Sequence, residues 1–112
     1  MEIETSLHDK VIAVTVKGRV DVNNAEKLSE HLNKYASAGS ARLVIDLKDV
    51  TYISSAGFRA LLITARSVKQ VDGKLALCGV VGEVKRLFDM ASFTDLFVIL
   101  PNLDDAIAAA NA

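Results

Sequence analysis

The sequence predicts an α/β protein: one domain with a mixed central sheet, an N-terminal antiparallel hairpin and helices packed against the sheet. Two observations predict it. A stretch of alternating apolar and polar residues and a nearly continuous apolar stretch, joined by three polar residues, open the chain, which is typical of a β-hairpin. After them, segments with helical periodicity alternate with short β-rich apolar runs, which favours parallel strands joined by helices. The expected order is ββαβαβαβα over residues 1–112, without a linker or repeat.

The hairpin is expected over residues 2–7 and 11–16. In the first segment Ile3, Thr5 and Leu7 alternate with polar residues, which predicts a half-buried strand near a sheet edge. The second segment is almost continuously apolar, and we expect it to end at a glycine, residue 18.

A first helix is expected after Asn24, and Asp21, Asn23 and Asn24 are each suitable cap residues. Residues 38–40, Ala-Gly-Ser, are expected to break it. Its apolar positions recur with the spacing of one helix face: Ala25, Leu28, Leu32, Tyr35 and Ala36.

Residues 43–62 are the most informative part of the chain, because they predict a buried strand, a short turn, two serines and a helix. The strand is expected over residues 43–47, and Ser54 and Ser55 stand where the helix begins. We expect this helix to end at Asp72-Gly73, with Gly73 in the left-handed cap position. The residues expected on its apolar face are Phe58, Leu61, Leu62, Ala65 and Val68.

Four more elements follow. Residues 74–78 predict a strand, and residues 96–100 a last strand before Pro101. Asn102 is expected to cap a final helix. The apolar faces of the two remaining helices are Val84, Leu87, Phe88 and Ala91 for the first, and Leu103, Ala106, Ile107 and Ala110 for the second.

Composition argues against several classes of protein. Lys and Arg number 13 against 14 acids, so no overall field favours nucleic acid or an anionic membrane. No apolar run approaches the roughly 20 residues of a membrane span. The acidic N-terminal segment predicts no signal peptide, so we expect a soluble cytoplasmic protein. The single cysteine, Cys78, is expected to be a small core residue.

Neither a metal nor a cofactor is expected. The two histidines, His8 and His31, have no partner at a metal-binding spacing, and both are expected on the solvated surface. Gly79 and Gly82 are not followed by Lys-Ser/Thr, so the phosphate-binding loop pattern of nucleotide sites is absent from the sequence.

The serine pair admits three interpretations: a helix cap, a nucleophile or an acceptor of phosphate. A hydrolase elbow requires Gly-x-Ser-x-Gly, but Ile53 stands where the first glycine would precede Ser55. A nucleophilic serine also needs a base, and neither histidine is expected near this edge of the sheet. We therefore expect no enzyme. On local evidence a simple cap is favoured over a modification site.

The chain resembles the STAS domains, and within them the single-domain anti-sigma factor antagonists. The similarity covers essentially the whole chain. It is strongest in residues 44–58, Val-Ile-Asp-Leu-Lys-Asp-Val-Thr-Tyr-Ile-Ser-Ser-Ala-Gly-Phe. Two further matches are Gly-Arg-Val-Asp at residues 18–21 and Val-Lys-Arg-Leu-Phe-Asp-Met at residues 84–90.

This resemblance implies a phosphorylation-switched binding module. In the family, a GHKL-type serine kinase that is also an anti-sigma factor phosphorylates the serine after the strand, and a PP2C-type phosphatase removes the phosphate. With Gly57 aligned to the family glycine, the acceptor is Ser55, with Ser54 as the alternative. The unphosphorylated form is expected to be a monomer when free, and to bind the kinase and release the sigma factor or another effector. The residues implied in partner binding are Asp21, Tyr52, Ser54, Ala56, Gly57, Phe58 and Arg59.

Three residues depart from the family pattern. Ser54 replaces a frequent aspartate, Ala56 replaces a hydroxyl residue, and Arg19 stands where an acidic residue is frequent. These departures bear on the identity of the partner. The alternative function is a STAS scaffold or sensor subunit without a serine switch, in which Ser55 only caps the helix.

Overall fold

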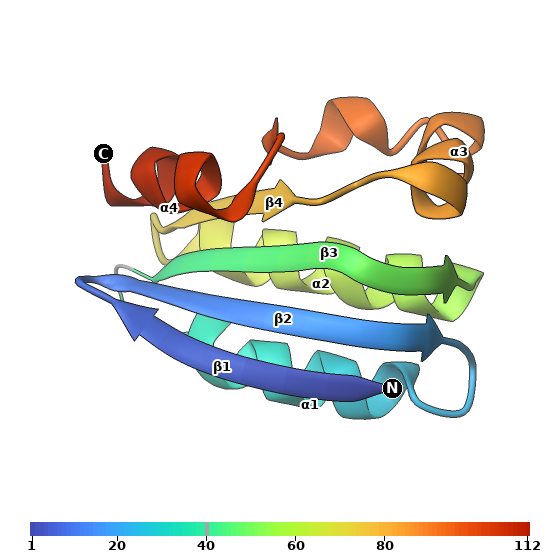
Figure 1. Ribbon diagram of the computed structural model, residues 1–112. Helices are drawn as coiled ribbons and strands as arrows, with labels where there is room; N and C mark the ends of the chain where they lie inside the picture. Colours follow the sequence, from blue (N-terminus) through green and yellow to red (C-terminus); the bar gives the residue numbers. More distant parts are fainter. Residues whose placement is uncertain (40) are drawn as a thin grey trace.

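The computed structural model describes residues 1–39 and 41–112, and it shows a five-stranded mixed sheet in the order β1-β2-β3-β4-β5 (Figure 1). β1 pairs antiparallel with β2, and the remaining pairs are parallel. The predicted order ββαβαβαβα is therefore confirmed. The elements are β1 (Glu2–His8), β2 (Val11–Val20), α1 (Ala25–Ala36), β3 (Arg42–Ile53), α2 (Ser55–Gln70), β4 (Lys74–Cys78), α3 (Gly82–Met90), the 3-10 turn η1 (Thr94–Leu96), β5 (Ile99–Leu100) and α4 (Leu103–Asn111).

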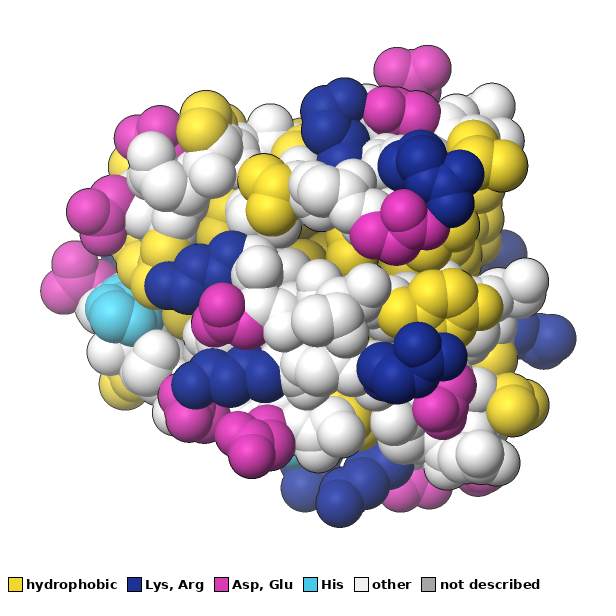
Figure 2. All heavy atoms as spheres, turned by 45° about the vertical axis from the view of Figure 1, so that its right-hand side comes forward, with side chains coloured by type: hydrophobic (Ala, Val, Ile, Leu, Met, Phe, Trp, Pro, Cys, Tyr) yellow, Lys and Arg dark blue, Asp and Glu magenta, His cyan; other side chains and the backbone are white. Residues whose placement is uncertain are grey.

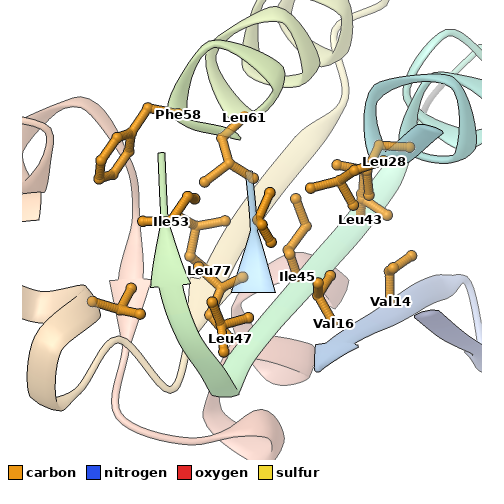
Figure 3. Close-up of a cluster of buried hydrophobic side chains, with 14 of the residues drawn as sticks. Val14, Val16, Leu28, Leu43, Ile45, Leu47, Ile53, Phe58, Leu61 and Leu77 are labelled. Carbon is orange, nitrogen blue, oxygen red and sulfur yellow. The ribbon is translucent and has the colours of Figure 1, made fainter. Parts of the chain in front are cut away.

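Helices cover both faces of the sheet. α1 and α2 pack together behind it in the view of Figure 1, and α4 lies in front of β4 and β3. The larger core lies under α1 and α2, where Leu28 and Leu61 meet strand residues such as Ile45 (Figure 3). A smaller core under α4 includes Ala106 and the buried Cys78. Among the described helices, none is long and apolar enough to cross a membrane.

Three strands run further than predicted, β1 by the single residue His8, which pairs with Val11. β2 continues through Gly18 to Val20, because Gly18 adopts φ +90, a conformation open to glycine, and remains paired with Val50. β3 reaches Ile53, so the predicted turn after residue 47 is wrong. The exposed charged residues Lys48 and Asp49 do not end the strand, because pairing resumes across a register shift with Asp49 opposite Lys17.

The last strand is shorter than predicted. Only Ile99 and Leu100 pair with β4, and residues 94–96 form a 3-10 turn. Leu96 and Val98 are each 58% exposed, so their apolar character did not mark buried strand positions.

The helix ends show two further differences. None of the three candidate side chains caps α1: Asn24 occupies the cap position, but its Oδ1 accepts from the amide of Asp21 at 2.9 Å. In the turn after α2, Asp72 and not Gly73 adopts the left-handed conformation, at φ +53. Gly73 is needed for a different reason, since a Cβ there would collide with the carbonyl oxygen of Ala41.

Two local predictions agree with the structure. Asn102 caps α4, its Oδ1 accepting from the amide of Asp105 at 2.9 Å. α1 ends at Ala36, just before the predicted break; of the break residues 38–40, Ser40 lies outside the described residues.

Candidate functional site

The residues expected to form a site meet where β2 and β3 end. Val20 lies opposite Ile53, and the amide of Ser54 donates to the carbonyl oxygen of Val20 at 2.9 Å. Asp21, which follows β2, is therefore brought beside the serine pair, which follows β3. The parallel register joins two segments more than thirty residues apart in sequence, at the right of Figure 1.

The two serines play different local roles. Ser54 is the N-cap of α2: its backbone is extended, and its Oγ accepts from the amide of Gly57 at 3.3 Å. Ser55 is the first residue of the helix and is exposed. Its hydroxyl has no hydrogen-bond partner in the described part of the chain. The helix cap thus belongs to Ser54, and the hydroxyl of Ser55 is left accessible.

Asp21 is tied into the turn before α1. Its carboxylate accepts from the amide of Asn23 at 3.0 Å, and its carbonyl oxygen accepts from the amide of Ala25 at 2.9 Å. Asn24 holds the same turn, since its Nδ2 donates to the carbonyl oxygen of Arg19 at 3.0 Å. Hydrogen bonds within residues 19–25 therefore fix the conformation of this segment, the Asp21 loop, in the free protein.

Arg19 and Tyr52 form a pair across the strand ends. They are register partners, and the Arg19 guanidinium carbon lies 4.4 Å from the centre of the Tyr52 ring. A guanidinium over an aromatic face is attracted by its quadrupole, so the positive charge of Arg19 is held over Tyr52, two residues before Ser54. The sequence placed both residues near the site but did not indicate this contact.

Gly57 and Phe58 are buried, although both were expected to contact a partner. A Cβ on Gly57 would come within 2.6 Å of Ile53 and 2.8 Å of Val20, so the glycine lets α2 approach the strand ends. Phe58 is 7% exposed and packs edge-on to two phenylalanines, Phe88 at 5.0 Å and Phe93 at 4.7 Å between ring centres. These two residues therefore position the start of α2 from within the core.

Two shallow grooves flank the start of α2. The first, about 350 Å³, runs between the serines and α3 and is lined by Tyr52, Ile53, Ser54, Ser55, Phe58, Leu87, Met90, Ala91 and Phe93. The second, about 450 Å³, lies between α1 and α2 and includes Ala56 and Arg59. At this end of the molecule, hydrophobic side chains alternate with charges of both signs (Figure 2).

The sequence did not identify the contribution of α3 to the first groove. Met90 is 70% exposed, and Leu87 is half-buried beside it. The available signal was a methionine off the apolar face of a short amphipathic helix, which sequence alone does not separate from an ordinary surface residue.

Both histidines lie on or beside β1. His8 shares a hydrogen bond with Ser6 at 2.9 Å, and His31 of α1 shares one with Thr5 at 2.8 Å. Contrary to expectation, neither is fully solvated, since both are half-buried. Burial, aided by the charge of Lys34, lowers the pKa of His31. In the described ranges, 1–39 and 41–112, no three His, Cys, Asp or Glu side chains gather as a metal site.

Cys78 is buried beside Asp46, as expected for a core residue. Burial and then the Asp46 carboxylate raise the pKa of its thiol to about 12. Only the thiolate is a strong nucleophile, so a buried and protonated thiol is a weak one at neutral pH.

Comparison with known proteins places this geometry in a family. The STAS domain model matches residues 2–106. BtrV of Bordetella bronchiseptica, named as a candidate anti-sigma factor antagonist, is 33% identical over 97% of this chain and 94% of its own. The anti-sigma-B factor antagonist of Staphylococcus aureus is 31% identical over 86% of this chain and 89% of its own.

Solved structures show the same fold. An anti-sigma factor antagonist from Mycobacterium paratuberculosis superposes with a TM-score of 0.81 at 27% identity, covering 99% of this chain and 94% of its own. The phosphorylated form of the Bacillus cell fate determinant SpoIIAA superposes with a TM-score of 0.73 at 13% identity. The superposition covers 96% of this chain and 98% of the SpoIIAA chain. The family model spans nearly the whole chain, and the fold and relatives agree with it: this chain belongs to the STAS domain family.

Proposed function

We propose that this protein is an anti-sigma factor antagonist and that phosphorylation of Ser55 controls its binding to a kinase-type anti-sigma factor. The observation that carries the proposal is the exposed Ser55 hydroxyl at the first residue of α2, beside the preformed Asp21 loop. The names of the relatives support the function as an anti-sigma factor antagonist. The existence of SpoIIAA in a phosphorylated form supports control by phosphorylation, by analogy of fold.

Ser55 suits the acceptor role better than Ser54. The Ser54 oxygen already accepts the Gly57 amide, so a phosphoryl group on Ser54 would alter the cap of α2. Ser55 can be modified while that cap stays in place. A helix N-terminus also favours anions, because its free amides and the helix dipole are positive there. The free protein can therefore carry the phosphate without refolding.

The same phosphate is expected to break the complex. It adds about −1.5 to −2 charges at neutral pH. A partner surface that fits a neutral hydroxyl would then face a buried negative charge, and like-charge contacts at an interface cost several kcal/mol. Since each ~1.4 kcal/mol is tenfold in affinity, one modified residue is enough to dissociate the two proteins. Release of the partner would then free it to capture its sigma factor or another effector.

The surface around Ser55 supplies the rest of the proposed interface. Tyr52 and the exposed parts of Ser54, Ala56 and Arg59 lie around it, and Asp21 stands on the neighbouring strand end. Gly57 and Phe58 contribute by holding α2 against the strand ends. Arg19 on Tyr52 makes this rim more basic than the family pattern, so we expect a partner with acidic residues opposite it.

The direct test is phosphorylation. The purified chain is incubated with the GHKL-type anti-sigma kinase of the same genome and ATP, and the modified residue is mapped by mass spectrometry. We expect one phosphate on Ser55, none on the Ser55→Ala variant, and unchanged phosphorylation of Ser54→Ala. A PP2C-type phosphatase is expected to remove the phosphate from Ser55. Binding of the kinase without any phosphorylation would instead indicate the scaffold or sensor role.

A further inference from the structure

The outer edge of β1 is unpartnered. β1 is the terminal strand of the sheet, and all seven of its residues pair with β2 on one side (Figure 1). No other described segment pairs with its second side. Such an edge presents a row of backbone donors and acceptors that can pair with another strand. β1 contains neither proline nor a register shift, which are two common ways of blocking this pairing.

We propose that two copies of this protein associate through their β1 strands, in an antiparallel pairing centred on Thr5. This register makes the strand complementary to itself. It places Ile3 opposite Leu7 of the second copy and Glu4 opposite Ser6. It also places Glu2 opposite His8 of the second copy. The interface is isologous, as a twofold dimer requires.

The apolar pair gives the contact its hydrophobic part. Leu7 is 68% exposed, although it lies on the same side of β1 as the half-buried Ile3. Beside Ile3, a hollow of about 370 Å³ opens between β1 and α1, lined by Met1, Ile3, Lys27, Glu30, His31 and Lys34. In the proposed register, Leu7 of the second copy lies directly opposite Ile3, at the border of this hollow. Each exposed leucine thus gains an apolar neighbour.

The charges on β1 do not oppose this pairing. Glu4 forms an ion pair with Lys17 of its own β2, with 3.3 Å between nitrogen and oxygen. The negative charge nearest to Thr5 is therefore compensated within each copy. Glu2 faces the imidazole of His8 and not another carboxylate. Acidic residues on an edge strand often prevent pairing. Here none lies directly opposite an acid of the second copy, and the two Glu4 side chains, which are diagonal neighbours in this register, are each paired with Lys17 of their own copy.

This association does not depend on the Ser55 switch, and it departs from the monomer expected from the sequence. Its interface is small, so a weak dimer is expected, in the range of about 1 mM to 10 µM. In sedimentation equilibrium, the apparent mass should rise with concentration from 12.0 kDa towards twice that value. Leu7→Lys should abolish the rise, whereas Leu96→Lys, at a residue 58% exposed elsewhere, should leave it unchanged.

Cysteine cross-linking tests the register. Cys78 is buried, so an introduced surface thiol is the reactive one. Directly opposite residues lie about 5 Å apart between Cα atoms, which suits a disulfide. Under mild oxidation Thr5→Cys should therefore form a covalent dimer. Two Glu2→Cys chains should not, since this register separates their thiols by about 20 Å. A mixture of Glu2→Cys and His8→Cys should cross-link.

Two results would overturn the proposal. One is a constant mass of 12.0 kDa up to a protein concentration of about 1 mM, because the dissociation constant of any dimer would then lie above the expected range. The other is equal cross-linking rates for Thr5→Cys and Glu2→Cys, which would indicate random collision. Circular dichroism of each variant confirms that the compared chains are folded.

Discussion

The Ser54 oxygen accepts the amide of Gly57 at 3.3 Å, so the first of the two adjacent serines caps α2. The second, Ser55, is exposed one residue further on. This division of roles underlies the account of the site, because it separates a structural hydroxyl from one that is open to modification.

The first prediction concerns stability. Ser54→Ala should lower the free energy of unfolding by about 1 kcal/mol, because α2 loses its side-chain cap. Ser55→Ala should change it by less than about 0.5 kcal/mol, because an exposed hydroxyl without a partner is removed. Urea unfolding of the two variants checks the difference. Equal losses would contradict the assignment of the cap.

The second prediction tests the approach of α2 to the strands. Gly57→Ala should lower the free energy of unfolding by about 1–3 kcal/mol, because the new Cβ crowds Ile53 and Val20. Gly39→Ala is the control, since a Cβ there meets no atom within 4 Å. It should be neutral or slightly stabilising in the same urea titration. A tolerated Gly57→Ala would show that α2 can shift away without cost.

The third prediction is a pH dependence from His31. Burial lowers its pKa in the folded chain below the ordinary histidine value of 6.5. Between the folded pKa and about 6.5, the unfolded chain binds more protons, so the free energy of unfolding should fall as the pH falls through this window. Urea midpoints measured at about pH 5 and pH 7.5 should show this fall. His31→Gln should weaken the dependence, and an unchanged slope would assign it to other groups.

The fourth prediction concerns Cys78. Its thiol is fully buried and its pKa is raised to about 12, so the native protein should not react with a thiol reagent at pH 8. The same chain in urea should react completely. The ratio of the two rates reports the opening of the smaller core under α4. Rapid labelling of the native chain would show that this core is not closed.

The order of elements followed from the sequence because it depends on local periodicity. The cap of α4 is an example: Asn102 and Asp105 are three residues apart, so the chain itself brings them together. The candidate site was predictable in the same way at the start of α2, where a strand, two serines and a helix are consecutive.

What the sequence could not supply depends on contacts between distant segments. Residues 48–53 read as a turn because two charged residues interrupt the apolar run, but pairing with β2 keeps them in β3. Leu96 and Val98 were assigned to a strand by hydropathy, whereas β5 pairs only from Ile99. Phe58 was expected on the apolar face of its helix, where the structure has it, but the family resemblance also placed it in the partner contact, and nothing local shows that Phe88 and Phe93 pack against it.

The central claim is that a charge on Ser55 decides partner binding, and the affinity of the kinase-type anti-sigma factor tests it most directly. Titration calorimetry would compare the unmodified chain with Ser55→Ala, Ser55→Asp and the chain phosphorylated at Ser55. We predict that Ser55→Ala binds like the unmodified chain and that phosphorylation weakens binding at least ~100-fold, or about 2.7 kcal/mol, with Ser55→Asp between them. Equal affinities for the phosphorylated and unmodified chains would contradict the account.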